Sequence, residues 1–302
     1  MAAAATDLRG TLLVNEPLSR YTSWRVGGPA ERLYRPADLA DLQAFLRRLP
    51  AAEPLFWLGL GSNLLVRDGG IRGTVILTQG ALQNIDIDEN GLIRAGAGVP
   101  CAKAARFAAR HNRVGAEFLA GIPGTLGGAL AMNAGAWGGE TWERVAAVET
   151  IDRQGVIRTR RPKDFAVGYR HVQGPEQEWF VAAHLTLPAG DGHASLARIR
   201  ELLERRARTQ PTGVASCGSV FRNPPGDHAA RLIDSAGLKG RCVGNACVSE
   251  RHANFIINTG GARAADMEAL IQQVAGTVAR VHGVQLIPEV RIVGEANEQA
   301  NA

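Results

Sequence analysis

Lysine is scarce in this chain of 302 residues: only three of its 34 lysines and arginines are lysine, and the formal net charge is +5. The arginines are spread along the chain in small clusters, and no long basic tract is interleaved with aromatic residues. A nucleic-acid-binding protein more often shows a concentrated basic patch. The charge therefore favours a small anionic ligand, and we expect no nucleic-acid partner.

Cysteine is also rare. The four cysteines, Cys101, Cys217, Cys242 and Cys247, form no Cys-x-x-Cys pair and no zinc-ligand spacing, so we expect no metal site. Four thiols in a chain of this length do not suggest a disulfide framework. The first seven residues lack the basic start and the apolar core of a secretory signal. These absences predict a cytoplasmic protein.

Long apolar runs are missing as well. The longest uncharged stretch, the 22 residues between Glu117 and Glu140, is interrupted by Pro123, Asn133 and seven glycines. A transmembrane helix needs about 18 or more consecutive apolar residues. We therefore expect no membrane contact.

Glycine is concentrated in this same stretch, notably at Gly121, Gly124, Gly127 and Gly128. Glycine lets the backbone approach another group closely and permits positive φ, so that successive N–H groups can converge on an anion such as a diphosphate. Close packing of the backbone alone is the alternative explanation. The pattern favours a loop that holds a phosphate-bearing cofactor.

A second glycine cluster, Gly59 to Asn63, follows an apolar run that resembles a strand. This order suggests the dinucleotide-binding βαβ unit, but Leu64 replaces the third glycine of that motif and no helical pattern follows. The usual dinucleotide fold is therefore excluded. Ser62 and Asn63 could surround a phosphate with a hydroxyl and an amide, or they could form an ordinary turn.

Hydrophobic periodicity predicts a mixed α/β chain. We expect helices over residues 39–49, 101–111, 196–203, 229–236 and 264–281, and strands over residues 55–58, 75–77, 148–152, 156–159, 179–187 and 255–257. Proline and glycine in residues 188–192 indicate a domain boundary. We expect a first region over residues 1–190, split into two subdomains near residue 52, and a second domain over residues 191–302.

Motifs in a fixed order run through roughly residues 15–294. They are Thr22-Ser23-Trp24-Arg25-Val26-Gly27-Gly28-Pro29-Ala30, Gly59-Leu60-Gly61-Ser62-Asn63-Leu64-Leu65-Val66, Gly121-Ile122-Pro123-Gly124-Thr125, Met132-Asn133-Ala134-Gly135-Ala136, Gly168-Tyr169-Arg170, Gly218-Ser219-Val220-Phe221-Arg222-Asn223-Pro224, Ser249-Glu250-Arg251-His252-Ala253-Asn254-Phe255 and Pro288-Glu289-Val290-Arg291. Together they resemble the UDP-N-acetylenolpyruvoylglucosamine reductase (MurB) family.

The resemblance implies an α/β fold of the vanillyl-alcohol-oxidase (PCMH) type that binds FAD, followed by a C-terminal α+β domain that binds a UDP-sugar. It implies NADPH-dependent reduction of the enolpyruvyl ether of UDP-N-acetylglucosamine enolpyruvate to UDP-N-acetylmuramate. This reaction belongs to peptidoglycan precursor synthesis, and so to cell-wall biogenesis, cell shape and cell division. The FAD contacts that the resemblance implies are Gly59, Gly61, Ser62, Asn63, Ile122, Gly124, Thr125 and Gly128.

The same resemblance implies three catalytic roles. Hydride addition to C3 of the enolpyruvyl group leaves negative charge at C2, which spreads into the neighbouring carboxylate. Arg170 would stabilise this charge, Glu289 would assist as an acidic group, and Ser219 would deliver a proton to C2. Taken singly, each of these residues has an ordinary surface or turn role. The substrate contacts implied are Tyr169, Arg222 and Asn223.

Two details depart from the commonest family pattern. Arg222 stands where the family usually has lysine, which keeps the charge but changes the geometry of a phosphate contact. No tyrosine follows Tyr169, so the tyrosine-bearing loop that closes over substrate in the longer class of the family is missing. The chain resembles the shorter class. Arg206, near the end of a predicted helix, could reach a phosphate or could only favour the helix dipole.

Two other functions remain open: another FAD-dependent oxidoreductase of the same fold that acts on an alcohol, and a nucleotide-binding module without catalysis. A bound oxidised flavin absorbs near ~450 nm and would exclude the module. Substrate-dependent oxidation of NADPH would separate the two enzymes. The residues do not determine the oligomeric state, for which a monomer is our expectation.

Overall fold

The computed structural model describes residues 8–297 and divides into two compact units. The first unit comprises residues up to Leu13, residues 32–60 and residues 73–204, and the second comprises residues 14–31, 61–72 and 205 onward. The second unit therefore includes two segments from the N-terminal part of the chain, whereas the sequence suggested two continuous regions that meet near residue 190. The division of the chain by function stays a prediction.

A four-stranded sheet has the order β1-β2-β5-β3, in which β3 and β5 run parallel. Helix α1 follows β2 and is capped at its N-terminus by Asp38, whose carboxylate accepts a hydrogen bond from the main-chain nitrogen of Asp41 at 2.9 Å. Leu42, Phe45 and Leu46 of this helix are buried in a small core. The elements are β1 (Thr11–Pro17), β2 (Pro29–Arg35), α1 (Leu39–Arg48), β3 (Leu55–Leu58) and β5 (Ile71–Leu77).

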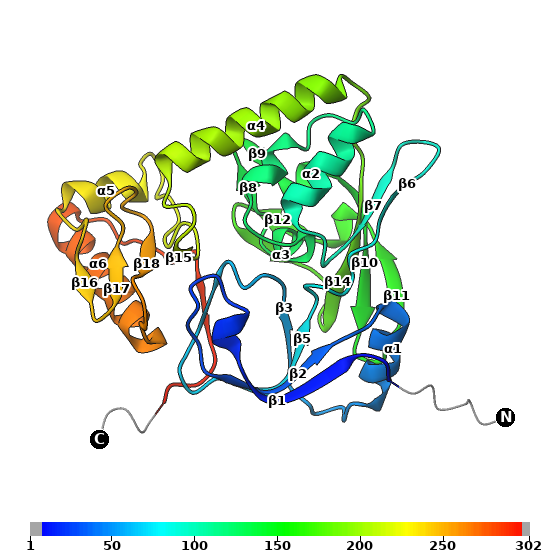
Figure 1. The fold of residues 1–302 in the computed structure, drawn as a ribbon, viewed down its shortest axis with the longest axis horizontal. Helices are drawn as coiled ribbons and strands as arrows, with labels where there is room; N and C mark the ends of the chain where they lie inside the picture. The colour runs from blue at the N-terminus through cyan, green and yellow to red at the C-terminus, as the bar shows by residue number, and fades with distance from the viewer. Residues whose placement is uncertain (1–7, 298–302) are drawn as a thin grey trace. The chain divides into compact units, whose positions relative to one another are not determined.

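The first unit also contains an antiparallel five-stranded sheet in the order β11-β10-β14-β7-β6 (Figure 1). The predicted hairpin is confirmed, because Ile151 of β10 pairs with Ile157 of β11. On β7, β10 and β14, the side chains of Arg94, Glu149 and His184 form a hydrogen-bonded row, with Arg94 donating to Glu149 at 2.6 and 2.7 Å. The strands are β6 (Ile85–Ile87), β7 (Ile93–Gly96), β10 (Val145–Asp152), β11 (Ile157–Arg160) and β14 (Glu178–Leu185).

Helices α2, α3 and α4 share one hydrophobic core with this sheet. The alanine-rich α2 buries small side chains, and Ile199 of α4 is buried in the same core. Helix α3 lies inside the uncharged stretch, where we expected only a loop. Its first two N–H groups donate outside the helix, Leu126 to the carbonyl of Val99 and Gly127 to that of Ala97. These elements are α2 (Cys101–Arg110), α3 (Leu126–Ala131) and α4 (Gly192–Thr209).

Short elements complete the first unit. Strands β8 and β9 form one hairpin and β12 and β13 another. The strands are β8 (Gly135–Ala136), β9 (Gly139–Glu140), β12 (Ala166–Gly168) and β13 (His171–Gln173). Single turns of 3-10 helix occur at Leu18–Arg20, Glu117–Gly121, Thr141–Arg144 and Pro162–Asp164, of which the first belongs to the second unit.

The second unit is built on a four-stranded sheet in the order β15-β18-β17-β16, with α5 and α6 contributing to its core. Trp24 is fully buried in this core and donates from Nε1 to the carbonyl of Ile256 at 2.7 Å. Strands β4 and β19 pair in parallel. The elements are β4 (Leu64–Val66), β15 (Ala215–Ser216), α5 (Ala229–Ser235), β16 (Cys242–Val243), β17 (Ala246–Val248), β18 (Ile256–Asn258), α6 (Ala264–His282) and β19 (Arg291–Val293).

One expectation about cysteine is wrong. Cys242 and Cys247 form a disulfide, because the two residues face each other across the pair of strands β16 and β17. The other cysteines, Cys101 and Cys217, are free and buried. The number of residues between two cysteines that pair across strands depends on the hairpin and matches no known cysteine motif. The sequence therefore did not indicate this disulfide.

Among residues 8–297, no helix is both long and apolar enough to cross a membrane. The same residues contain no group of three or more histidine, cysteine, aspartate or glutamate side chains placed to hold a metal ion.

Candidate functional site

The two predicted glycine motifs meet in the first unit, where Gly59 lies against Thr125. A Cβ at Gly59 would collide with the Oγ1 atom of Thr125. The carbonyl of Gly124 accepts a hydrogen bond from the main-chain nitrogen of Cys101 at 2.9 Å, which holds the loop before α3 against the start of α2. Ile122, also a predicted FAD contact, lies in this loop and is half-buried. Four of the predicted cofactor residues are thus gathered around the start of α3.

A fifth predicted cofactor residue, Gly128, differs from its neighbour Gly127. A Cβ at Gly127 would lie 2.9 Å from the Cβ of Ala97, so packing alone requires this glycine. Gly128 is exposed, and a Cβ there would approach only Thr125 Oγ1, at 3.8 Å, among the described residues. Oγ1 of Thr125 is itself buried and has no hydrogen-bond partner within residues 8–297. A buried hydroxyl without a partner costs free energy, and a ligand oxygen would satisfy it.

The remaining predicted cofactor residues, Gly61, Ser62 and Asn63, belong to the second unit. Gly61 has φ of 56°, and a Cβ there would collide with the carbonyl oxygen of Tyr21. Asn63 donates from Nδ2 to the carbonyl of Glu289 at 3.1 Å. The backbone conformation at Gly61 and the hydrogen bond of Asn63 would therefore require these two residues whether or not a cofactor binds.

Arg170 sits in the turn between β12 and β13 with a positive φ of 53°. Its guanidinium donates to the main-chain carbonyls of Asn133 at 3.3 Å and Gly135 at 3.1 Å, and it lies 4.9 Å from the ring centre of Tyr169. Two carbonyl acceptors and an aromatic face orient the charged group. The structure therefore holds Arg170 as an oriented cation beside the Met132–Ala136 motif.

Asn133 is the residue that the sequence reasoning missed. It is buried with φ of 45°, and its Nδ2 atom donates to Glu140 Oε2 at 2.8 Å and to the carbonyl of Gly168 at 3.2 Å. Its Oδ1 atom accepts from the main-chain nitrogen of Trp142 at 3.1 Å. The side chain thus fixes the backbone whose carbonyl receives Arg170. The only sequence signal was its place inside a glycine-rich motif.

Ser219 lies in the second unit, just after β15 and Gly218, whose φ is 81°. The segment that follows Ser219 is held by Asn254, which is buried: the main-chain nitrogen of Val220 donates to its carbonyl at 2.9 Å, and that of Phe221 to its Oδ1 at 3.0 Å. The serine is itself half-exposed. A rigid backbone therefore presents a hydroxyl that a ligand can reach.

Glu289 meets the Ser219 loop across the second unit. Its main-chain nitrogen donates to the carbonyl of Val220 at 2.7 Å, so Glu289 contacts the residue next to Ser219. Burial, with the negative charge of Glu289 as a further cause, raises the pKa of the Cys217 thiol well above its ordinary value. The structure thus brings the backbone of Glu289 next to the loop that carries Ser219.

The predicted substrate residues Arg222 and Asn223 continue the same loop. Arg222 donates from its main-chain nitrogen to the carbonyl of Ile287 at 2.9 Å. Oδ1 of Asn223 accepts from the main-chain nitrogen of Ala229 at 3.1 Å, at the first residue of α5, which is a structural role. Arg206 donates from Nε to Gln210 Oε1 at 3.1 Å, and burial lowers the pKa of its guanidinium.

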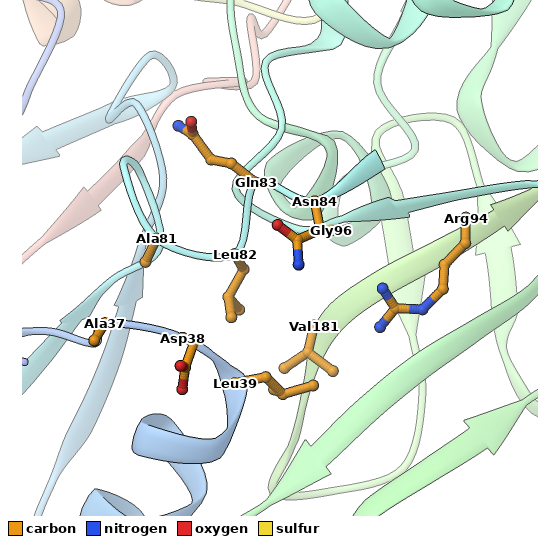
Figure 2. Close-up of a pocket in the computed structure, with 10 residues that line it drawn as sticks. All are labelled: Ala37, Asp38, Leu39, Ala81, Leu82, Gln83, Asn84, Arg94, Gly96 and Val181. Atoms are coloured by element: carbon orange, nitrogen blue, oxygen red, sulfur yellow. The ribbon is translucent and has the colours of Figure 1, made fainter. Parts of the chain in front are cut away.

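A pocket of about 120 Å³ lies in the first unit beside the start of α1, but no predicted site residue lines it (Figure 2). Its charged groups have partners, since Arg94 pairs with Glu149 and Asp38 pairs with Arg9. The lining residues are Ala37, Asp38, Leu39, Ala81, Leu82, Gln83, Asn84, Arg94, Gly96 and Val181. We assign no role to this pocket.

Comparison with known proteins first shows the fold class of this chain. Residues 30–160 match the FAD binding domain family. The chain also resembles the crystal structure of 6-hydroxy-D-nicotine oxidase from Arthrobacter nicotinovorans, with a TM-score of 0.57 over 96% of this chain and 91% of that one, at 12% identity. The fold is therefore of the vanillyl-alcohol-oxidase type, as the resemblance implied.

The family follows from closer relatives. Residues 210–293 match the C-terminal domain of UDP-N-acetylenolpyruvoylglucosamine reductase. The chain is 68% identical over 98% of its length to the enzyme of that name from Alkalilimnicola ehrlichii, of which it covers 99%. It superposes on the Thermus caldophilus enzyme with a TM-score of 0.81, at 34% identity over 95% of this chain and 99% of that one. The chain belongs to the UDP-N-acetylenolpyruvoylglucosamine reductase family.

Proposed function

We propose that this protein reduces the enolpyruvyl ether of UDP-N-acetylglucosamine enolpyruvate to UDP-N-acetylmuramate, with FAD as cofactor and NADPH as co-substrate. The observation that carries the proposal is the contact of Glu289 with Val220, at 2.7 Å between main-chain nitrogen and carbonyl oxygen. This main-chain contact supports a site in which the Glu289 carboxyl acts together with the Ser219 hydroxyl. A hydroxyl and a carboxyl group together are what protonation of a carbanion requires.

The residues around Thr125 fit a diphosphate-bearing cofactor. Thr125 Oγ1 offers a buried hydroxyl without a partner among the described residues, and Gly128 leaves open space beside it. These residues, with Gly59, Ile122 and Gly124, would hold FAD through neutral donors. Gly61, Ser62 and Asn63 would add to this set. Bound FAD, once reduced by NADPH, supplies the hydride for C3 of the substrate.

Arg170 would stabilise the negative charge that develops at C2 and in the adjoining carboxylate. Its two carbonyl contacts fix the direction of the guanidinium before the substrate binds. A charge oriented in advance stabilises a transition state without the cost of reorganisation. Asn133 would act as a positioning residue, because it fixes the backbone that receives Arg170.

Ser219 would donate its hydroxyl proton to C2, and Glu289 would assist as an acidic group in the same step. The overall change adds one hydride to C3 and one proton to C2, so the double bond becomes single and the ether remains intact. Serine then regains its proton from solvent. A neutral hydroxyl is a weak acid, so the donation depends on the strong basicity of the carbanion.

The substrate's UDP group would be bound by Tyr169, Arg222 and Asn223. By this proposal residues 1–190 form the FAD-binding region and residues 191–302 the substrate-binding domain, and Tyr169 is a contribution of the first region to substrate binding. The reaction would take place in the cytoplasm, in peptidoglycan precursor synthesis, and would affect cell shape and cell division through the supply of cell-wall precursor. We propose that the enzyme is a monomer and that the reaction itself requires neither a membrane nor a nucleic-acid partner.

Product analysis tests this function against the alcohol oxidase alternative. Purified protein with FAD, NADPH and UDP-N-acetylglucosamine enolpyruvate should consume NADPH and yield a product with two more hydrogen atoms than the substrate, seen by mass spectrometry. A protein that oxidises an alcohol would leave this substrate unchanged. An unchanged substrate would reject the proposed function even if flavin were bound.

A further inference from the structure

A groove in the first unit is lined by residues of α2 and α4, none of which is assigned a role at the site above; Figure 1 shows these two helices side by side. Its volume is about 380 Å³. The floor is apolar and consists of Leu196, Ile199 and Leu203, of which Ile199 is buried and the other two are half-buried. The other lining residues are basic, namely Arg106, Arg110, His193 and Arg200.

Helical spacing places these side chains on two facing stripes. Arg106 and Arg110 lie one turn apart on α2. On α4, His193, Leu196, Arg200 and Leu203 recur at intervals of three and four residues, which is the spacing of a single helix face. The basic rim and the apolar floor therefore belong to one continuous surface.

The arginines of this rim are not neutralised by the protein. Within residues 8–297, the guanidinium groups of Arg106, Arg110 and Arg200 form no hydrogen bond or ion pair, and no carboxylate lines the groove. On the same helix, by contrast, Arg198 pairs with Glu201 at 2.6 Å. Like charges that surround an apolar concave surface raise the local positive potential. An isolated exposed arginine is simply hydrated by the solvent. The apolar side chains of the floor, by contrast, gain no favourable free energy from contact with water.

We propose that this groove binds a phosphate-bearing ligand whose phosphate carries an apolar substituent. Guanidinium groups bind phosphate oxygens through paired hydrogen bonds, and they do so better than lysine would. The apolar substituent would cover Leu196 and Leu203 and so remove them from water. The volume lies within the range of small-molecule sites, roughly 300–1,000 Å³. Such a ligand could be a free phosphoester or the head of a membrane lipid.

Hexyl phosphate is a probe that combines both parts of this chemistry. Isothermal titration of the FAD-loaded enzyme should show saturable binding of hexyl phosphate that is tighter than binding of inorganic phosphate. The triple variant R106Q/R110Q/R200Q should bind it about tenfold or more weakly, because it loses the charge-assisted hydrogen bonds. Leu196→Gln should weaken hexyl phosphate while leaving inorganic phosphate nearly unchanged.

A charge-matched control is R35Q/R47Q/R280Q, which removes three exposed arginines that do not line the groove. It should bind hexyl phosphate like the wild type. The groove variant should keep both flavin half-reactions, which separates this inference from the proposed function. Equal binding by the groove variant and the wild type, or no saturable binding by the wild type, would overturn the proposal.

Phosphatidate vesicles identify the source of the ligand. Sedimentation of the wild type with these vesicles, lost in the groove variant, would assign the groove to a lipid head group. Binding of hexyl phosphate without sedimentation would assign it to a free phosphoester. Both results support recognition of a phosphate with an apolar substituent.

Discussion

Thr125 lies so close to Gly59 that a Cβ at the glycine would collide with the threonine Oγ1 atom. The contact joins two glycine motifs that are far apart in the chain. The hydroxyl of Thr125 is buried and has no hydrogen-bond partner among residues 8–297. Packing thus explains Gly59, while the unsatisfied hydroxyl points to a ligand, and the two explanations can be tested separately.

Gly128 tests cofactor binding without disturbing the backbone. Gly128→Val adds a side chain into open space on α3, so the protein should fold but lose most of its FAD, because the new methyl groups occupy the space beside Thr125. Flavin content after purification, from visible absorption, measures this.

Gly276→Val is the matched control, because Gly276 is also an exposed helical glycine with open space around its α-carbon. It should retain full flavin. Full FAD occupancy in Gly128→Val would remove Gly128 from the cofactor site. Gly61 is a poor choice for this test, since its φ of 56° and its contact with Tyr21 make any side chain disruptive.

Ser219 separates the two half-reactions. Ser219→Ala should leave reduction of FAD by NADPH nearly intact and slow reoxidation by substrate by about 10² or more, as expected for loss of a positioned acid. Ser219→Cys should retain part of the activity, because a thiol can also donate a proton. Stopped-flow absorbance resolves the two steps. Reoxidation of Ser219→Ala at the wild-type rate would assign the proton to another donor.

Asn133 should act through Arg170. Asn133→Gly keeps the positive φ of 45° but removes the hydrogen bonds to Glu140 and Gly168. We expect substrate-driven reoxidation to slow by about tenfold, consistent with a lost positioning contact, while flavin reduction is unchanged. In an Arg170→Ala background the same change should have no further effect. Additive losses in the double variant would show that Asn133 acts independently.

The sequence predicts a helix or strand where the residues that determine it lie close together in the chain. Helix α6 could be predicted because its apolar residues recur at helical spacing and Gly283 ends it with φ of 68°. Helix α3 could not, because Gly127 and Gly128 disfavour helix, and its first N–H groups are satisfied by distant carbonyls of Val99 and Ala97.

In the candidate site, too, arrangements that depend on residues far apart in the chain could not be predicted from the sequence. Motifs identified Ser219 and Glu289 separately, but the approach of the Glu289 segment to the Ser219 loop depends on the hydrogen bond from Glu289 to Val220, which no local pattern encodes. Trp24 likewise belongs to the second unit through contacts distant in the chain, among them its hydrogen bond to Ile256. Asn133 was missed because its importance comes from partners on separate turns and strands.

Glu149 provides a pH-dependent test of the fold. Hydrogen bonds from Arg94 first, and then His184, hold the pKa of the Glu149 carboxyl below its ordinary value despite partial burial. A carboxyl with a lowered folded-state pKa stabilises the fold above its unfolded pKa, and this stability is lost as pH falls through the folded pKa. Glu149→Gln should therefore cost about 1–3 kcal/mol at pH 7, and the cost should shrink in acid.

Urea unfolding at pH 7 and at successively lower pH measures this difference. Glu201→Gln is the control, because its ion pair with Arg198 is more than half exposed on both sides and should contribute little. A cost for Glu149→Gln that stays constant as the pH falls below the ordinary carboxyl range would contradict the assigned role of the ion pair.

By the proposed function, this protein passes electrons from NADPH to an enolpyruvyl UDP-sugar through FAD. The most direct test is the flavin absorbance near ~450 nm under strictly anaerobic conditions. Addition of one equivalent of NADPH should bleach this band, and subsequent addition of UDP-N-acetylglucosamine enolpyruvate should restore it. A flavin that bleaches with NADPH but stays reduced after the substrate is added would contradict the account.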